Sequence, residues 1–253
     1  MGRHVRSWKK CNIPAFLFFI IMAYFYFTAT LLRGNMLLSL FLGTMTLVSL
    51  YTAALIHPGP VPDAWKHEQR EAVRSHEWCK QCDSARPERA HHCHYCGECI
   101  VRYDHHCDWI DNCVGTRNHK LFFLFLLYIS LSILHFLWMF VAFFRGDNSR
   151  TVQAVVAGKT KEVVNLVLLI FYCMIVIPCA IFAFSFLGCT GWMISRNETS
   201  FDRNVGSRHF GRGLTRNLME VFGPNPLLWL VPTIPPVNMP LPQDGFDKLA
   251  DLV

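Results

Sequence analysis

The sequence predicts an all-α membrane protein: four transmembrane helices, with a cytosolic cysteine-rich double-zinc domain inserted between helices 2 and 3. The chain of 253 residues is 52% hydrophobic and only 17% charged, against about 25% charged in soluble domains. Its apolar residues gather in four long uncharged runs, and seven of its eleven Cys lie between Cys79 and Cys113. The composition excludes a disordered chain, and a net charge of +6 gives no basic surface that would indicate nucleic-acid binding.

Four stretches are predicted to cross the membrane. They are residues 13–32, 36–56, 121–144 and 163–187, which contain 20, 21, 24 and 25 residues and no Asp, Glu, Lys or Arg. A hydrocarbon core about 30 Å thick needs roughly 20 apolar residues in a helix. The first stretch is too long for the apolar core of a signal peptide, and no small-x-small cleavage pattern follows it. We therefore expect it to remain as a helix.

The basic residues predict how the helices are oriented. Nineteen Lys and Arg lie in residues 1–12, 57–120 and 195–253, and only five lie in the connections on the opposite side. Because positive charge collects on the cytosolic side, both termini and the central loop are predicted to be cytosolic. The membrane is left open among endoplasmic reticulum, Golgi and plasma membrane. The predicted parts are the N-terminus with helices 1 and 2 (1–56), the cysteine-rich domain (57–120), helices 3 and 4 with a short lumenal loop (121–194) and the C-terminal tail (195–253).

The central loop contains ligands for two zinc ions. Structural zinc takes four ligands from Cys thiolates and His nitrogens, often in pairs two residues apart. With seven Cys and several His in the loop, six Cys and two His would complete two sites and leave one Cys without a metal. Spacing alone does not decide which residues share a site, and the alternative is a set of buried thiols. In the reducing cytosol, metal binding or catalysis is more usual for such residues than disulfides.

The run Asp104-His105-His106-Cys107 resembles the DHHC family of protein S-acyltransferases, or palmitoyltransferases. The preceding Cys and His spacing, the later Cys113, and Asn118 and Phe122 all continue that pattern. The resemblance is close over residues 79–122, and the four-helix layout extends it over most of the chain. It implies that Cys107 is the nucleophile and that two structural zinc sites interleave. One site would consist of Cys79, Cys82, His92 and Cys99, and the other of Cys93, Cys96, His106 and Cys113.

The chemistry of the residues supports the same nucleophile. Only a few per cent of an ordinary Cys is thiolate at neutral pH, so an adjacent base must take the proton. His105 is the histidine left after the metal ligands are counted, and Asp104 would hold its ring in the required tautomer. The alternative for His105 is a supporting hydrogen bond to a zinc ligand.

The position of Cys107 indicates the substrate. Leu121 begins a helix only about 14 residues later, so we expect the thiol near the cytosolic membrane face, where a long-chain acyl-CoA can be bound. In the expected reaction Cys107 is autoacylated from palmitoyl-CoA or a similar donor and then passes the acyl group to a protein cysteine. The candidates for the CoA phosphates are Arg86, Arg89, Arg117 and Lys120; the alternative for each is a membrane-surface anchor. Candidates near the acyl chain are Trp109, Phe122 and Ser132, and the alternative for the helical stripe that contains the last two is helix packing.

Motifs outside the loop match the family more loosely. Thr199, Ser200 and Asp202 resemble its Thr-Thr-x-Glu motif, and Asn217 resembles an Asn of its C-terminal stretch. Asp108 stands where the family has Pro after the nucleophile, and His57 stands where it has Asp. An inactive relative serving as a scaffold is therefore one alternative, and a membrane-anchored zinc-dependent ubiquitin ligase is another. The expected partners are the lipid bilayer, acyl-CoA and cysteine-containing proteins. An accessory protein is left open, and nucleic acid is not expected.

Overall fold

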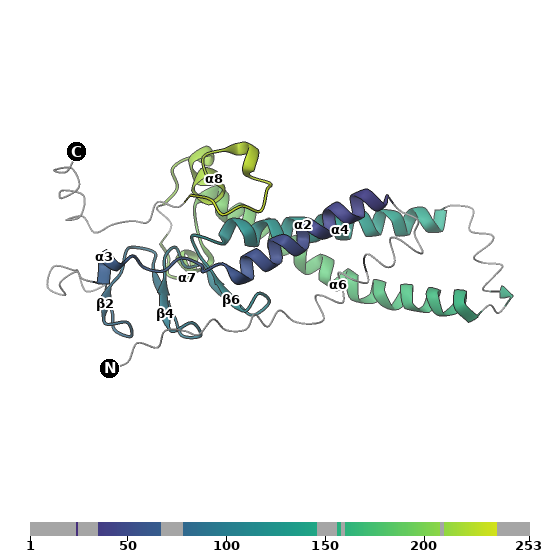
Figure 1. Cartoon of the computed structure of the whole chain (residues 1–253), viewed down its shortest axis with the longest axis horizontal. Coiled ribbons are helices and arrows are strands. Elements are labelled where there is room, and N and C mark those ends of the chain that lie inside the picture. Colours follow the sequence, from purple (N-terminus) through teal and green to yellow (C-terminus); the bar gives the residue numbers. More distant parts are fainter. Residues whose placement is uncertain are drawn as a thin grey trace. The chain divides into compact units, whose positions relative to one another are not determined.

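The fold is that of a mostly helical chain with a small cysteine-rich region (Figure 1). The computed structural model describes residues 24, 35–66, 78–145, 156–157, 160–207 and 210–236. These form two compact units. One unit comprises residues 1–13, 50–122 and 191–253, and the other comprises residues 14–49 and 123–190.

Three described helices are long and apolar enough to cross a membrane. They are α2 (Met36–Leu55), α4 (His119–Arg145) and α6 (Thr160–Arg196). The chain is therefore built as a multi-pass membrane protein, with the cysteine-rich region between α2 and α4. The prediction for residues 13–32 falls outside the described residues, except for Tyr24.

Helix α6 is longer than the predicted stretch 163–187. The apolar run ends near Leu187, but no residue after it breaks the helix until Asn197, which has a φ of 56°. Such a left-handed residue just beyond the last turn is a common way to end a helix, and Asn adopts it more readily than most residues. Pro178 lies inside α6 without ending it.

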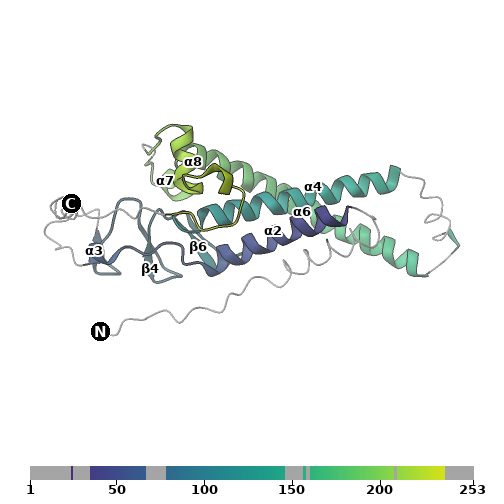
Figure 2. The ribbon, with the colours of Figure 1, turned by 45° about the horizontal axis from the view of Figure 1, so that its top comes forward.

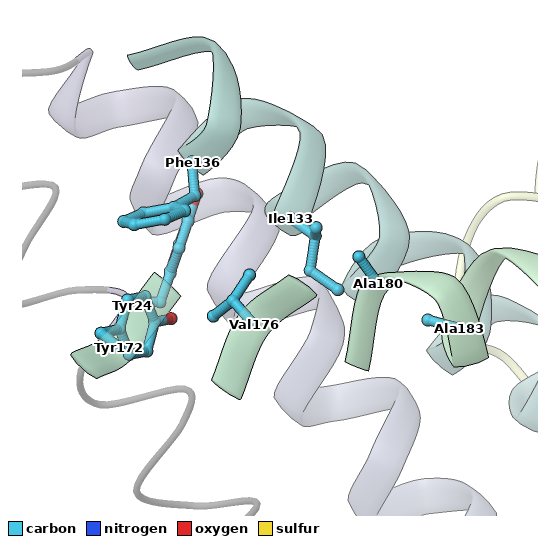
Figure 3. Packing of buried hydrophobic residues seen from close by; sticks show 7 residues of the cluster. All are labelled: Tyr24, Ile133, Phe136, Tyr172, Val176, Ala180 and Ala183. Atoms are coloured by element: carbon cyan, nitrogen blue, oxygen red, sulfur yellow. The ribbon is translucent and has the colours of Figure 1, made fainter. Parts of the chain in front are cut away.

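The membrane unit has a core between α4 and α6. Its buried residues follow helical spacing on both helices, as Figure 3 shows, and small Ala side chains allow the two backbones to approach closely. The core also buries a polar group, because His135 Nδ1 lies 2.8 Å from the hydroxyl of Tyr24. The members of the core are Tyr24, Ile133, Phe136, Tyr172, Val176, Ala180 and Ala183.

The cysteine-rich region consists of three antiparallel two-stranded hairpins, preceded by the single turn α3 (Asp63–Lys66). The strands contain only two or three residues each, too few to bury a sheet core of their own. Figure 2 shows the hairpins in succession. They pair β1 (Trp78–Cys79) with β2 (Ser84–Ala85), β3 (His91–Cys93) with β4 (Glu98–Ile100), and β5 (His105–Cys107) with β6 (Asn112–Val114).

Three short helices follow α6 in the same unit as the hairpins. Helix α7 (Ser200–Asn204) starts with a capping box, in which the side chains of Thr199 and Asp202 each accept the backbone N–H of the other residue. Helix α8 (Leu214–Phe222) ends at Gly223, whose φ of 89° suits a residue without a side chain. The 3-10 turn η3 (Pro226–Leu228) completes the described C-terminal part.

Candidate active site and metal centres

The three hairpins repeat one pattern every 14 residues. Cys79, Cys93 and Cys107 occupy equivalent places on the first strand of each hairpin, as the pairing registers show. A second Cys follows three residues later in the first two hairpins, but Ile110 stands there in the third. Each metal cluster joins the Cys pair of one hairpin to a His and a Cys of the next. Cys107 belongs to neither cluster because the described chain has no fourth hairpin to supply those partners.

The first cluster brings together Cys79, Cys82, His92 and Cys99. The Cys82 Sγ atom lies 3.2 Å from His92 Nδ1 and 3.7 Å from Cys99 Sγ, and Cys79 Sγ lies 3.7 Å from His92 Nδ1. A tetrahedral zinc with bonds of about 2.0–2.3 Å places its ligand atoms about 3.3–3.8 Å apart. These separations therefore fit one such ion.

The second cluster has the same donor set, Cys93, Cys96, His106 and Cys113. The distances from His106 Nδ1 to the three sulfur atoms are 3.6, 3.5 and 3.4 Å, and Cys96 Sγ lies 3.3 Å from Cys113 Sγ. The Tyr95 ring stacks on the His106 ring at 4.7 Å between centroids, which restrains the orientation of that ligand. Three sulfurs and one nitrogen at these distances again fit a metal that prefers soft ligands in tetrahedral geometry.

The structure brings Asp104, His105 and Cys107 together at the third hairpin. The His105 Nδ1 atom lies 2.6 Å from Asp104 Oδ2. Burial lowers the pKa of His105, but hydrogen bonds to Asp104 and Cys107 and the negative charges of both outweigh it and raise the pKa to about 10. His105 is thus a strong base in contact with the thiol, and the Cys107 side chain is shielded from solvent.

Asp104 is held in place by the segment that follows α6. Its Oδ1 atom accepts a hydrogen bond of 2.8 Å from the backbone N–H of Ser200, and its backbone carbonyl accepts one of 3.3 Å from the Ser200 hydroxyl. Burial raises the pKa of Asp104, but the hydrogen bond from His105 and the nearby imidazoles outweigh it and hold the pKa below its usual range. The motif that includes Ser200 therefore contributes to the site by donating hydrogen bonds to Asp104.

Comparison with known proteins identifies the family. The family model described as DHHC palmitoyltransferase matches residues 72–206, which is more than half of the chain. The chain belongs to the DHHC palmitoyltransferase family. The sequence-based predictions of this family and of protein S-acylation are thereby confirmed, and the ubiquitin-ligase alternative is dropped.

Relatives in plants and animals carry matching names. Probable protein S-acyltransferase 13 of Arabidopsis thaliana is 31% identical over 255 residues, which cover 87% of this chain and 82% of that protein. Palmitoyltransferase ZDHHC15 of Xenopus laevis is 31% identical over 67% of the chain and 48% of that protein. Palmitoyltransferase ZDHHC20 of Mus musculus is 29% identical over 64% of the chain and 46% of that protein. The matched part spans about half the length of these two animal relatives.

An ionic cluster around Arg89 and Arg102 was not predicted from the sequence. Arg89 donates to Asp202 Oδ2 at 2.6 Å, and its guanidinium lies 4.1 Å from the centre of the Phe210 ring. Arg102 donates to His119 Nδ1 at 2.8 Å. Both arginines also donate to Asn197 Oδ1 and lie 3.4–3.5 Å from Glu220 Oε1. The cluster ties the hairpins to α7 and α8, and its partners lie about 100 residues apart in sequence.

Two asparagines attach the third hairpin to the end of α2. The Asn112 side chain, directly across from Cys107 in the strand register, donates to the carbonyls of Ala53, Ala54 and Ile56 at 2.9–3.2 Å. Asn118 also donates to Ala53 O, at 3.0 Å. The last carbonyls of a helix have no partner within the helix, so these amides satisfy them and fix β6, the strand paired with the one that bears Cys107.

The four basic residues predicted to bind CoA phosphates have different surroundings. Arg89 lies in the ionic cluster, and Lys120 is 1% exposed and donates to Leu228 O and Thr233 Oγ1. Arg86 lies 2.9 Å from His91 Nδ1, and Arg117 is half-buried at the end of the third hairpin.

The predicted acyl-chain residues and Asn217 are also described. The Phe122 ring meets the His105 ring edge-on at 5.4 Å, and Trp109 is 40% exposed. Ser132 lies in the membrane unit, where its hydroxyl is 3.4 Å from Thr46 Oγ1. Asn217 donates to Ser195 O and accepts from the backbone of Arg212, so it ties α8 to the end of α6.

Proposed function

We propose that this S-acyltransferase uses Cys107 as its nucleophile, with palmitoyl-CoA or a similar long-chain acyl-CoA as donor and protein cysteines as acceptors. The observation that carries the proposal is the position of Cys107. It occupies the place of a metal-binding Cys in the hairpin repeat but lies outside both clusters, next to a His105–Asp104 pair.

In the first step, His105 takes the proton of the Cys107 thiol. Its Nδ1 atom is engaged by Asp104, so Nε2 is the atom that receives the proton. The thiolate attacks the thioester carbonyl carbon of acyl-CoA, and the bond from that carbon to the CoA sulfur breaks. The CoA thiolate takes the proton from His105 and leaves as the free thiol, so His105 is again able to accept a proton. Cys107 then carries the acyl group as a thioester.

In the second step the same residues act in the reverse direction. His105 takes the proton of a protein cysteine, whose thiolate attacks the acyl carbon on Cys107. The Cys107 thiolate leaves and regains the proton from His105. Asp104 stabilises the imidazolium that forms in both steps, and the bonds from Ser200 keep Asp104 oriented.

We propose zinc as the metal of both clusters. Three Cys and one His form a common closed ligand set for structural zinc, and no water position is needed for the chemistry. Bound zinc would supply folding energy to a region whose strands are too short to hold a core. The eight ligands would thus position the third hairpin while Cys107 remains available for acylation.

We propose that the chain is oriented in the membrane as the distribution of its Lys and Arg residues predicts. Both termini and residues 57–120 would face the cytosol, so that acylation occurs at the cytosolic surface. Arg89 and Lys120 already donate to internal acceptors, and Arg86 donates to His91 Nδ1, so Arg117, half-buried after the third hairpin, is the better candidate of the four for the CoA phosphates. Trp109 and Phe122 would contact the acyl chain near its thioester.

The test is acyl loading of the purified full chain with palmitoyl-CoA. Wild type, Cys107→Ser and Cys189→Ser are compared, because Cys189 is an exposed Cys on α6 outside both clusters. Each protein must first be shown to carry two zinc ions. A thioester that neutral hydroxylamine cleaves should form on wild type and Cys189→Ser and be absent from Cys107→Ser. A zinc-loaded wild type without label would favour the inactive relative, and Asp108→Pro would then show whether Asp108 is the cause.

A further inference from the structure

The segment after α8 exposes several apolar side chains. No charged residue occurs between Glu220 and Asp244. The exposed fraction is 87% for Leu227 and 59% for Leu230, and both fractions are high for leucine side chains. This surface, which we call the C-terminal apolar loop, comprises the exposed side chains of Leu227, Leu228, Leu230, Val231 and Ile234.

The polar groups of the same segment point inward. Lys120 Nζ donates to Leu228 O at 2.8 Å and to Thr233 Oγ1 at 3.0 Å. The Trp229 indole donates to Gly223 O at 2.9 Å and its ring packs on Phe222 at 5.7 Å between centroids. The loop is therefore fixed in one conformation that turns its leucines outward, rather than exposing them through lack of structure.

The position of Lys120 indicates which environment the C-terminal apolar loop contacts. It is the second residue of α4, and the uncharged stretch 121–144 begins directly after it. The two hydrogen bonds hold the loop at the level where α4 begins its candidate membrane span. An exposed surface at this level that consists of Leu, Val and Ile side chains and contains no charge has the character of a membrane-contacting patch. At nine residues, 226–234 is far too short to cross the bilayer.

We propose that the C-terminal apolar loop is a lipid-binding surface that enters the boundary between headgroups and acyl chains beside α4. Leu227 and Leu230 would contact lipid, while Lys120 satisfies the backbone carbonyl of Leu228 by donating a hydrogen bond to it. This proposal rests on the membrane-spanning helices and not on the acyl-transfer reaction, so either can fail without the other. The competing occupant is a protein, either a second copy of this chain or an accessory subunit.

The test uses the full chain in phosphatidylcholine nanodiscs with the photoreactive amino acid benzoyl-phenylalanine at one position per variant. The positions are Leu227, Leu230 and, as the control, Tyr95, which is 70% exposed on the turn between β3 and β4. After irradiation, mass spectrometry measures the fraction of each chain that is bound covalently to phosphatidylcholine. We expect several-fold more lipid adduct at 227 and 230 than at 95.

Two results would overturn the proposal. One is a lipid adduct at 227 and 230 no greater than at 95, since all three variants are reconstituted in the same bilayer. The other is a dominant crosslink from 227 or 230 to a second protein chain, which would assign the surface to a protein partner. Because both substituted leucines are exposed, the variants should fold, and bound zinc measured on each confirms it.

Discussion

Replacing Asp104 with Asn is expected to slow acylation of Cys107 by about 10²–10⁴-fold. Asp104 uses both carboxylate oxygens: Oδ1 accepts from Ser200 N–H at 2.8 Å and Oδ2 lies 2.6 Å from His105 Nδ1. An Asn has only one acceptor oxygen, and the backbone N–H of Ser200 cannot turn away. The oxygen therefore stays with Ser200 and the amide NH₂ faces His105 Nδ1. Nδ1 must then accept, the ring proton moves to Nε2, and Nε2 is no longer able to take the proton of Cys107.

The assay is a single-turnover measurement of thioester formation from palmitoyl-CoA, with zinc content determined for every sample. Asp83→Asn is the matched control: it makes the same exchange on the exposed turn of the first hairpin, at a φ of 48° that Asn tolerates. The control should react at the wild-type rate. An Asp104→Asn protein with two zinc ions and a rate within about three-fold of wild type would refute the tautomer argument.

Three further outcomes are expected. Cys96→Ser should lower the bound zinc from about two equivalents to one, measured by atomic absorption, because the second cluster loses one of its four ligands; a protein that keeps both ions would contradict the assignment. Asp202→Asn should lower the free energy of unfolding by about 3–5 kcal/mol, measured by thermal melting in detergent, since it leaves the buried Arg89 guanidinium without its 2.6 Å carboxylate partner. An unchanged melting temperature would show that the pair is dispensable. Gly115→Ala should cost about 1–3 kcal/mol in the same melting assay, because the new Cβ would stand 2.5 Å from Ile100 Cγ2. Gly188→Ala on α6, where a Cβ meets nothing within 4 Å and φ is not positive, should show no such loss.

The parts of the fold that local sequence determines were predicted well. The predicted stretches 36–56 and 121–144 correspond to α2 and α4, because an uncharged run of that length is itself the signal for a membrane helix. The two ligand sets that the resemblance implied are the sets that the structure brings together. The 14-residue repeat is visible in the sequence. Even without the family pattern, it would have shown that Cys107 lacks the second Cys that accompanies Cys79 and Cys93 three residues later.

The contacts that join distant segments were not predicted. Ser200 was recognised as part of a motif, but its bond to Asp104 joins residues 96 positions apart. Arg89 was considered for phosphate binding, whereas the structure gives it an internal carboxylate partner. A basic residue near a membrane looks the same in sequence whether it binds a ligand or a buried carboxylate, and only the fold distinguishes the two. The end of α6 was missed because the helix continues through an uncharged segment after Leu187 to Arg196 and ends only at the left-handed Asn197.

The two interleaved clusters connect the three hairpins one after another, so losing one cluster does not have the same effect as losing the other. The first cluster joins the first hairpin to the second, and the other cluster joins the second hairpin to the third. Damage to a ligand of the first cluster leaves the hairpin of Cys107 bound through the remaining ion and through Asn112 to α2. Loss of the other ion leaves that hairpin attached through Asn112 to α2 and through Asp104 to Ser200. Sensitivity to thiol oxidants and chelators should therefore be graded along the region, with the greatest effect on acylation from the cluster that includes ligands of the third hairpin.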